Sequence, residues 1–172
     1  MAALSARASL DPSKALTQYV HRSWQADFGL PQNSVLAIAQ TPDGYLWLGT
    51  ENGLVRFDGV RFTLFDQHSI AGLRSNEIRA LLVDRAGNLW IGTHGGGLAC
   101  FSHGKFKVLD ARSGLSSDSI LALYEDHRGT LWIGTDGGGL IRFDGGKFRT
   151  FRKADGLADD AVFSISGDDS GT

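Results

Sequence analysis

The amino-acid sequence predicts an all-β fold built from a repeated four-stranded unit, because three sequence markers recur with one period. The first marker is a Leu-Trp-(Leu/Ile)-Gly-Thr string, whose tryptophans lie 43 and 42 residues apart. The second is a Gly-Leu pair at intervals of 43, 42 and 42 residues, and the third is another Gly-Leu pair that opens an alternating segment. The markers are Trp47, Trp90 and Trp132, then Gly29, Gly72, Gly114 and Gly156, then Gly53, Gly97 and Gly139. Three markers in step indicate an internal repeat.

The third unit shows its four strands most clearly. They are predicted over 120–125, 131–135, 140–143 and 148–151, with Gly and Asp clusters between them. These clusters supply the positive-φ positions that tight hairpins need. A four-stranded antiparallel sheet cannot cover both of its faces alone, and stacking copies around an axis solves this problem in a β-propeller. A helical alternative fails, because apolar residues do not recur at helical spacing and glycine interrupts almost every window.

The predicted fold is therefore an all-β β-propeller fragment of about three and a half four-stranded blades, part of a larger propeller for which seven blades are expected. A tail occupies 1–17, and its Ala6-Arg7-Ala8 triplet is either an ordinary start or the remnant of a signal peptide. The remainder, 18–172, is the partial propeller. Its predicted parts are an outer strand over 18–24, blades over 34–66, 77–110 and 119–152, and an inner strand over 161–166. Counted strand by strand, the order is one, four, four, four, one.

Composition narrows the class of protein. The chain has 172 residues, 42% of them apolar, and a formal net charge of −2, which is globular and unlike a nucleic-acid-binding protein. Cys100 is the single cysteine, so neither a disulfide framework nor a Cys-based metal site can form within the chain, and a buried filler role is expected for it. No apolar run approaches the roughly 18 residues of a membrane span, so this segment is not expected to contact a membrane.

Each tryptophan of the repeat is expected to fill the wedge between neighbouring blades rather than to stack on a ligand, since repeated positions in packed elements are usually structural. Gly49, Gly92 and Gly134 follow these tryptophans by two residues. Glycine at this place predicts a close approach of adjacent blades.

The sequence offers no constellation for catalysis, so no catalytic residue, metal site or cofactor is expected. Gly95-Gly96-Gly97 and Gly137-Gly138-Gly139 resemble phosphate-binding loops, but no helix follows them and hairpin turns are the better interpretation. The histidines show no repeated metal-ligand spacing and are expected in solvated loops. They are His21, His68, His94, His103 and His127.

Polar residues precede each inner strand and follow each second strand. Because inner strands line the axis of a propeller, these residues are expected to ring one mouth of the central channel. One interpretation is turn chemistry, which favours Asn, Asp and Ser. The other is a rim of hydrogen-bonding groups for a polar ligand such as a glycan. The candidate ligand-binding residues are Asn33, Glu51, Asn76, His94, Asp118, Asp136 and Asp160.

The third repeat reads Asp-x-x-Gly-x-Leu-Trp-Ile-Gly-Thr over 126–135, then Gly139-Leu140, then Gly-Leu-x-x-Asp over 156–160. This pattern resembles the two-component regulator propeller repeat. The resemblance covers nearly the whole chain from Tyr19, and the first repeat departs from it only at a turn, with Thr41 in place of the later aspartates.

The resemblance implies a non-catalytic sensor propeller, periplasmic or extracellular, within a membrane-anchored protein whose output module is a histidine kinase or a diguanylate cyclase. An unknown small molecule or oligosaccharide is the expected partner, and nucleic acid is not. The alternatives are a propeller enzyme of the streptogramin-lyase type and a protein-interaction scaffold. An enzyme would need a histidine with a metal or base partner, which His94 alone does not provide. Open blade edges also predict self-association of the chain.

Overall fold

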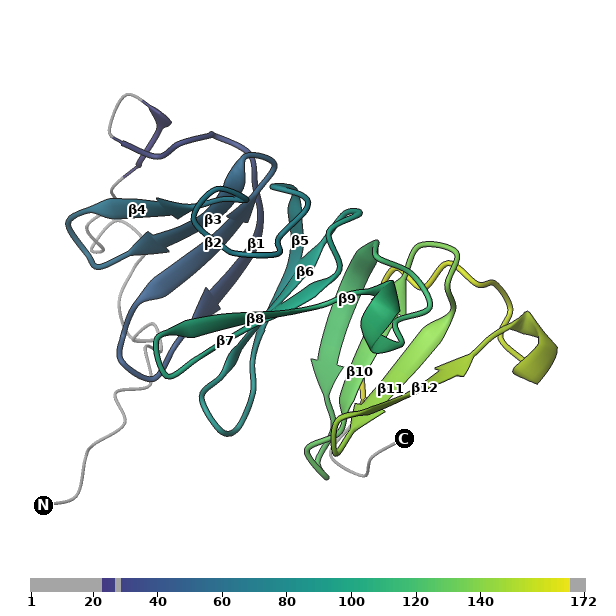
Figure 1. The fold of residues 1–172 in the computed structure, drawn as a ribbon. Coiled ribbons are helices and arrows are strands. Elements are labelled where there is room, and N and C mark those ends of the chain that lie inside the picture. The colour runs from purple at the N-terminus through teal and green to yellow at the C-terminus, as the bar shows by residue number, and fades with distance from the viewer. Residues whose placement is uncertain (1–22, 27–28, 168–172) are drawn as a thin grey trace, which may run out of the picture.

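The computed structural model describes residues 23–26 and 29–167, which form three four-stranded antiparallel sheets (Figure 1). Each sheet uses four consecutive strands in chain order, as expected for propeller blades. The first blade contains β1 (Val35–Gln40), β2 (Leu46–Thr50), β3 (Gly53–Phe57) and β4 (Phe62–Phe65). The second contains β5 (Ile78–Val83), β6 (Leu89–Thr93), β7 (Leu98–Ser102) and β8 (Lys105–Leu109). The third contains β9 (Ile120–Glu125), β10 (Leu131–Thr135), β11 (Leu140–Asp144) and β12 (Lys147–Phe151).

The predicted all-β propeller fold is confirmed. Helix is confined, in the part of the chain from 29 to 167, to two short 3-10 turns over Ala111–Ser113 and Lys153–Asp155. Both end at a glycine in the left-handed conformation, Gly114 (φ 104°) and Gly156 (φ 105°). These glycines belong to the second Gly-Leu marker, so the marker records the turn that leads into each inner strand.

Of the two single strands predicted at the ends, the first lies mostly outside the described residues and the second does not form. The outer strand over 18–24 lies outside the described residues except for 23–24, which are not in a strand. The segment 161–166 is extended but is not a strand, although Val162 N donates to the Thr135 carbonyl at 2.9 Å. A strand needs a neighbour on its own sheet, and this segment contacts the preceding blade instead. The described residues therefore hold twelve strands, the three complete blades.

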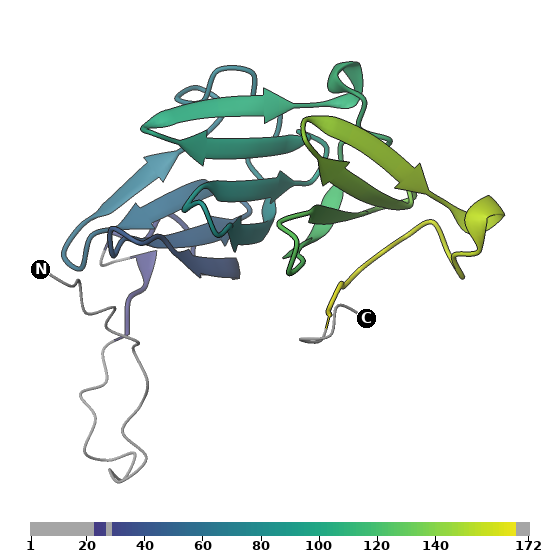
Figure 2. The same ribbon diagram turned by 90° about the horizontal axis from the view of Figure 1, so that it is seen from below.

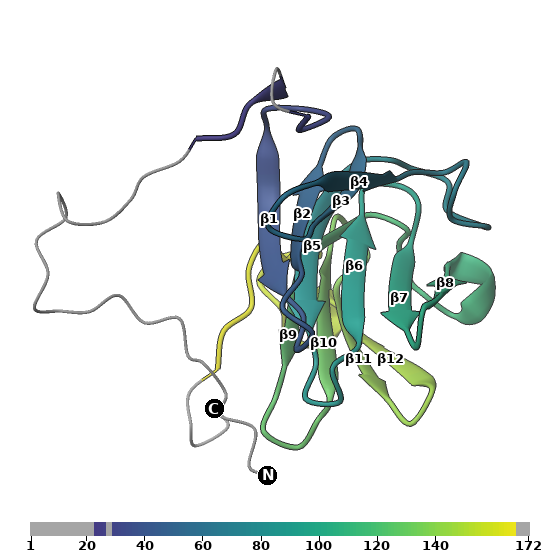
Figure 3. The ribbon, with the colours of Figure 1, turned by 90° about the vertical axis from the view of Figure 1, so that its left-hand side faces the viewer.

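The innermost strands β1, β5 and β9 lie next to one another, and the sheets extend away from them. In Figure 3 these three strands lie toward one side with the C-terminal segment, while β4, β8 and β12 lie toward the other. Figure 2 shows the same arrangement from below, with the C-terminal segment running past the last blade. Inner strands on a common axis are what a propeller requires, and they place one edge of every blade at the channel.

Two hydrophobic clusters hold the three blades together, one at each blade–blade interface. Trp47 is 1% exposed, and its ring lies 5.3 Å from that of Phe101 in the next blade. Trp90 contacts Phe143 of the following blade at 5.6 Å in an edge-on arrangement. The predicted wedge role is thus confirmed for these two tryptophans, and it requires a phenylalanine from the third strand of the neighbouring blade.

The glycines after the tryptophans allow the close blade approach that the sequence predicts. A Cβ at Gly92 would lie 2.6 Å from Ile120 Cγ2, and one at Gly49 would lie 2.9 Å from Ile78 Cγ2. At Gly134 the nearest atom is the Val162 carbonyl oxygen, at 2.5 Å. Any side chain at these positions would therefore push the next inner strand away.

Candidate functional site

The predicted rim residues lie at one end of the blades, where the start of each inner strand contacts the β-turn between the second and third strands. His94 N donates to the Glu77 carbonyl at 2.9 Å, and Asp136 N donates to the Ser119 carbonyl at 3.0 Å. The turn of the second blade also reaches the third blade, because Gly97 N donates to the Asp118 carbonyl at 2.8 Å. The two groups of residues predicted separately thus share one surface, here called the rim.

In each of the four rim residues that precede an inner strand, one side-chain oxygen is hydrogen-bonded within its own loop. Each accepts a hydrogen bond from a backbone N–H earlier in the same loop, which is the turn chemistry considered for them. The pairs are Asn33 with Ala26 at 2.8 Å, Asn76 with Gln67 at 2.9 Å, Asp118 with Ala111 at 2.9 Å, and Asp160 with Lys153 at 2.7 Å. These oxygens therefore hold the loops in place, as the turn interpretation requires.

Asp118 has a second partner. Its Oδ2 accepts from Arg74 Nη2 at 2.9 Å, and the same nitrogen donates to Asp110 Oδ2 at 3.0 Å. Arg74 belongs to the loop before the second blade, so this one nitrogen joins two consecutive loops across an interface. Such a side chain stabilises the rim rather than leaving an open charge for a ligand.

The other three candidates, Glu51, His94 and Asp136, are exposed on the turns. Glu51 exchanges two hydrogen bonds with Gln32, through its backbone N–H at 2.9 Å and its carboxylate at 2.7 Å. His94 Nδ1 lies 3.2 Å from Glu77 Oε2. Glu77 also pairs with Arg79 of β5, so the second blade carries a Glu–His–Arg cluster at the rim.

Arg79 was not among the residues singled out from the sequence. The sequence contains a signal for it, because the equivalent positions of the neighbouring repeats hold the apolar residues Leu36 and Leu121. Glu51 and Asp136 place exposed carboxylates at the rim, and carboxylates of this kind accept hydrogen bonds from hydroxyl groups. Among residues 23–26 and 29–167, no group of three or more His, Cys, Asp or Glu side chains is arranged to hold a metal ion.

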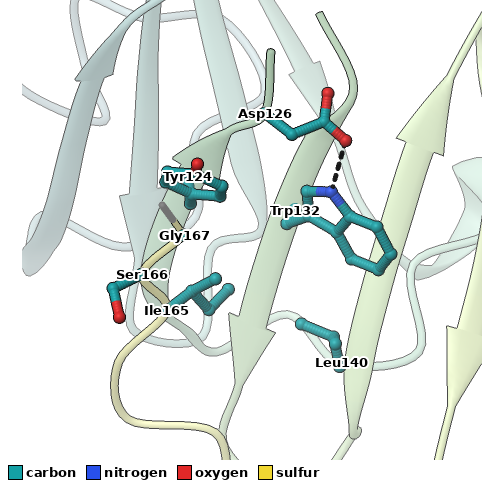
Figure 4. Close-up of a pocket in the computed structure, with 7 residues that line it drawn as sticks. All are labelled: Tyr124, Asp126, Trp132, Leu140, Ile165, Ser166 and Gly167. Atoms are coloured by element: carbon teal, nitrogen blue, oxygen red, sulfur yellow. Dashed lines mark hydrogen bonds between the residues drawn. The ribbon is translucent and has the colours of Figure 1, made fainter. Parts of the chain in front are cut away.

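A pocket of about 230 Å³ lies away from the rim, on the outer face of the last blade (Figure 4). Trp132 and Asp126 form one wall, joined by a hydrogen bond, and Tyr124 and Ile165 form another. The equivalent space over Trp47 is filled by Phe101, and that over Trp90 is filled by Phe143. The pocket is therefore a blade-packing surface, shaped for an aromatic ring from a neighbouring blade.

The three repeated four-stranded blades define this chain as part of a β-propeller. The family model described as "two component regulator propeller" matches it three times, at 29–52, 72–95 and 114–137. The resemblance inferred from the sequence is confirmed, because the chain carries three two-component regulator propeller repeats.

A solved structure supports the same relationship. The extracellular domain assigned to a hybrid two-component system of B. thetaiotaomicron is 26% identical, with a TM-score of 0.75 over 83% of this chain and 22% of that chain. Virginiamycin B lyase from Staphylococcus aureus, solved with quinupristin, is 14% identical with a TM-score of 0.57 over 71% of this chain and 42% of the lyase. The likeness to the lyase concerns the fold alone.

Among curated proteins, "Histidine kinase P4" of Formosa agariphila is 41% identical over 49 residues. That match covers 28% of this chain and 4% of the kinase. The chain thus spans only a small part of the relatives it matches. Within the described residues, no helix is both long enough and apolar enough to cross a membrane.

Proposed function

We propose that this chain is the ligand-sensing propeller of a bacterial two-component signalling protein and that it acts outside the cytoplasmic membrane. The observation that carries this proposal is the agreement between three matching repeats and the similarity to an extracellular domain of a hybrid two-component system over 83% of the chain. A propeller in that position reports on molecules that the cell meets at its surface. The chain itself would bind its ligand without turning it over.

The output module proposed for the whole protein is a histidine kinase, with a diguanylate cyclase as the second possibility. The match to a histidine kinase over 49 residues supports the first. In either case ligand binding to the propeller would be the stimulus, and a membrane anchor outside this segment would carry the signal inward.

The proposed ligand is a small polar molecule, such as an oligosaccharide, bound at the rim. Glu51, Glu77 and Asp136 present carboxylates on one surface, and hydroxyl-rich molecules donate to such groups. A lyase activity has less support, because the similarity to the lyase is one of fold and His94 is paired with Glu77 rather than with a metal-binding set.

Calorimetric titration against a panel of neutral and acidic oligosaccharides tests the rim directly. The informative variant combines Glu51→Gln and Asp136→Asn, which removes two exposed carboxylates and keeps their shapes. Asp144→Asn is the matched control, because Asp144 is equally exposed but ends β11 in an outer hairpin. We expect a sugar that binds the wild type and the control but binds the double variant more weakly. Equal binding to all three proteins would remove the rim as the site.

A further inference from the structure

Every complete blade has a β-bulge at the same place in its innermost strand. In β1, Val35 pairs with Thr50 and Ala37 pairs with Gly49, so Leu36 is the extra residue. The register shifts in the same way at Arg79 in β5 and at Leu121 in β9. A bulge leaves its extra residue outside the ladder and turns the side chain in a new direction. A feature present in all three blades is part of the architecture rather than a local irregularity.

The residues on either side of each bulge are nearly constant, whereas the bulge residue varies. A β-branched residue precedes it and rests on a glycine of the preceding blade, as Ile78 rests on Gly49. An alanine follows it and pairs with the glycine of its own blade, as Ala80 pairs with Gly92. These flanking side chains fill the interfaces, so their size is fixed. The bulge residue faces neither interface and is free to differ.

Three of the four equivalent positions are apolar, yet only Leu121 among the four is even half-buried. Leu36 is 40% exposed, and the Arg79 side chain is 41% exposed. The segment after the third blade continues the series, since Phe163 follows Val162 as Leu121 follows Ile120, and Phe163 is 75% exposed. Because β1 packs beside β5 and β5 beside β9 (Figure 3), the equivalent positions follow one another from blade to blade. They are here called the bulge row: Leu36, Arg79, Leu121 and Phe163.

Arg79 brings the single positive charge into the bulge row. Glu77 engages one guanidinium nitrogen and also contacts His94, so the head group is held at the rim. The guanidinium group carries five N–H donors, and one carboxylate oxygen cannot satisfy them all. Arg79 therefore keeps donors for a second anion, next to apolar side chains that offer no competing acceptor.

We propose that the bulge row is a binding subsite for an organic carboxylate that carries an apolar ring or chain. The carboxylate pairs with Arg79, and the apolar part lies along Leu121 and Phe163. This inference deepens the proposed sensor function, on which its biological meaning rests, by naming the chemistry that the channel edge selects. The rim carboxylates and the bulge row then contact different parts of one ligand.

Two small probes of the same shape separate charge from apolar contact. Benzoate carries both a ring and a carboxylate, whereas benzyl alcohol carries the ring and a neutral hydroxyl. Titrations of the ¹⁵N-labelled chain, followed by NMR, give an affinity and a location for each probe. We expect benzoate to shift the amide signals around Arg79, Leu121 and Phe163 and to bind up to about fivefold more tightly than benzyl alcohol, the range for an exposed ion pair.

Two variants assign the contributions. Arg79→Leu makes the row uniformly apolar and should abolish the preference for benzoate, whereas Phe163→Ala should weaken both probes. Arg61→Leu is the matched control, because Arg61 is an exposed arginine of the hairpin between β3 and β4. The inference is overturned if the wild type binds the two probes equally, or if the shifted signals surround only Trp24 and Trp132 on the open blade faces. Loss of oligosaccharide binding in the rim double variant is a separate measurement, so the sensor proposal and this one can fail independently.

Discussion

Asp126 accepts a hydrogen bond from the indole of Trp132, Nε1 to Oδ2, at 2.9 Å. The second blade repeats this bond between Trp90 and Asp84, also at 2.9 Å. In the first blade the acceptor is Thr41 Oγ1, at 3.0 Å from Trp47 Nε1. The aspartate of the repeat therefore does two things: it orders the hairpin through backbone N–H groups, and it fixes the tryptophan that begins the next interface. Thr41 preserves the second of these without a charge.

This arrangement predicts an acid-sensitive contribution to stability from Asp126. Burial opposes ionisation of the carboxyl group, but hydrogen bonds from Trp132 and from the backbone of Thr130 and Arg128 outweigh it and lower the pKa to about 2. Because the folded pKa lies below the ordinary value, the contribution is present at neutral pH, begins to fall near pH 4 and is lost as pH passes through about 2. Asp126→Ala should therefore cost about 1 kcal/mol or more at pH 7 and progressively less toward pH 2. Urea titrations at several pH values measure the difference, and a gap that does not change with pH would contradict the role of the ionised group.

The three repeat tryptophans should differ in their contribution to stability according to what covers them. Trp47 is buried at an interface, and Trp47→Ala should cost about 3–5 kcal/mol. Trp90 is covered less completely, so Trp90→Ala should cost less free energy of unfolding. Trp132 lies on the open face, so Trp132→Ala should cost least. Denaturant titrations rank the three, with His68→Ala as an exposed control. A loss below about 1 kcal/mol for Trp47 would rule out the wedge role.

Gly92→Ala should destabilise the chain by about 1–3 kcal/mol, because the added Cβ collides with Ile120 rather than straining the backbone. Gly92 has no positive φ, so the effect isolates the blade approach. Shortening the neighbour should relieve the collision, and Gly92→Ala combined with Ile120→Ala should cost less than the sum of the single changes. A double-mutant cycle measures this coupling, and strict additivity would show that the two positions do not press on each other.

We also propose that the chain self-associates through its open blade faces. The pocket over Trp132 lacks the phenylalanine that fills its equivalents, while the open face of the first blade carries Phe62 and Phe57, with Phe57 covered in part by Trp24. These phenylalanines correspond in the repeat to Phe101 and Phe106. A second copy could therefore continue the blade series by the contacts already used within one chain.

Sedimentation at micromolar concentration tests this proposal. Ile38 is 66% exposed on the open face of the first blade, and Ile38→Lys should shift the equilibrium toward monomer. Val60→Lys is the control, because Val60 is 83% exposed at a hairpin tip away from that face. A wild type that sediments as a monomer and unfolds cooperatively would show that the uncovered faces do not recruit a second copy.

Repetition explains why so much of the fold could be predicted from the sequence. Each strand of the third blade was expected within a residue of its observed bounds, because three aligned copies mark the same turns. The contacts of individual side chains were harder to predict. The sequence alone does not tell whether Asn33 and Asp160 form turns or contact a ligand, whereas their hydrogen bonds show the turn role. The bulge that exposes Arg79 was also hidden, because a register shift depends on the pairing of two strands rather than on the order of residues in one.

The threonine that ends each Leu-Trp-x-Gly-Thr string has a further consequence. Thr93 is fully buried, and its Oγ1 donates to the Gly97 carbonyl at 2.8 Å, while the Gly97 amide donates to Asp118 of the next blade. The hydroxyl therefore stabilises the turn between β6 and β7, and the same turn is hydrogen-bonded to the following blade. An ordered blade therefore stabilises the next blade directly. This effect weakens with each further blade, as in a one-dimensional chain of coupled units. Hydrogen exchange should then be slowest in β6, which has a coupled neighbour on each side, and faster toward both outer sheets.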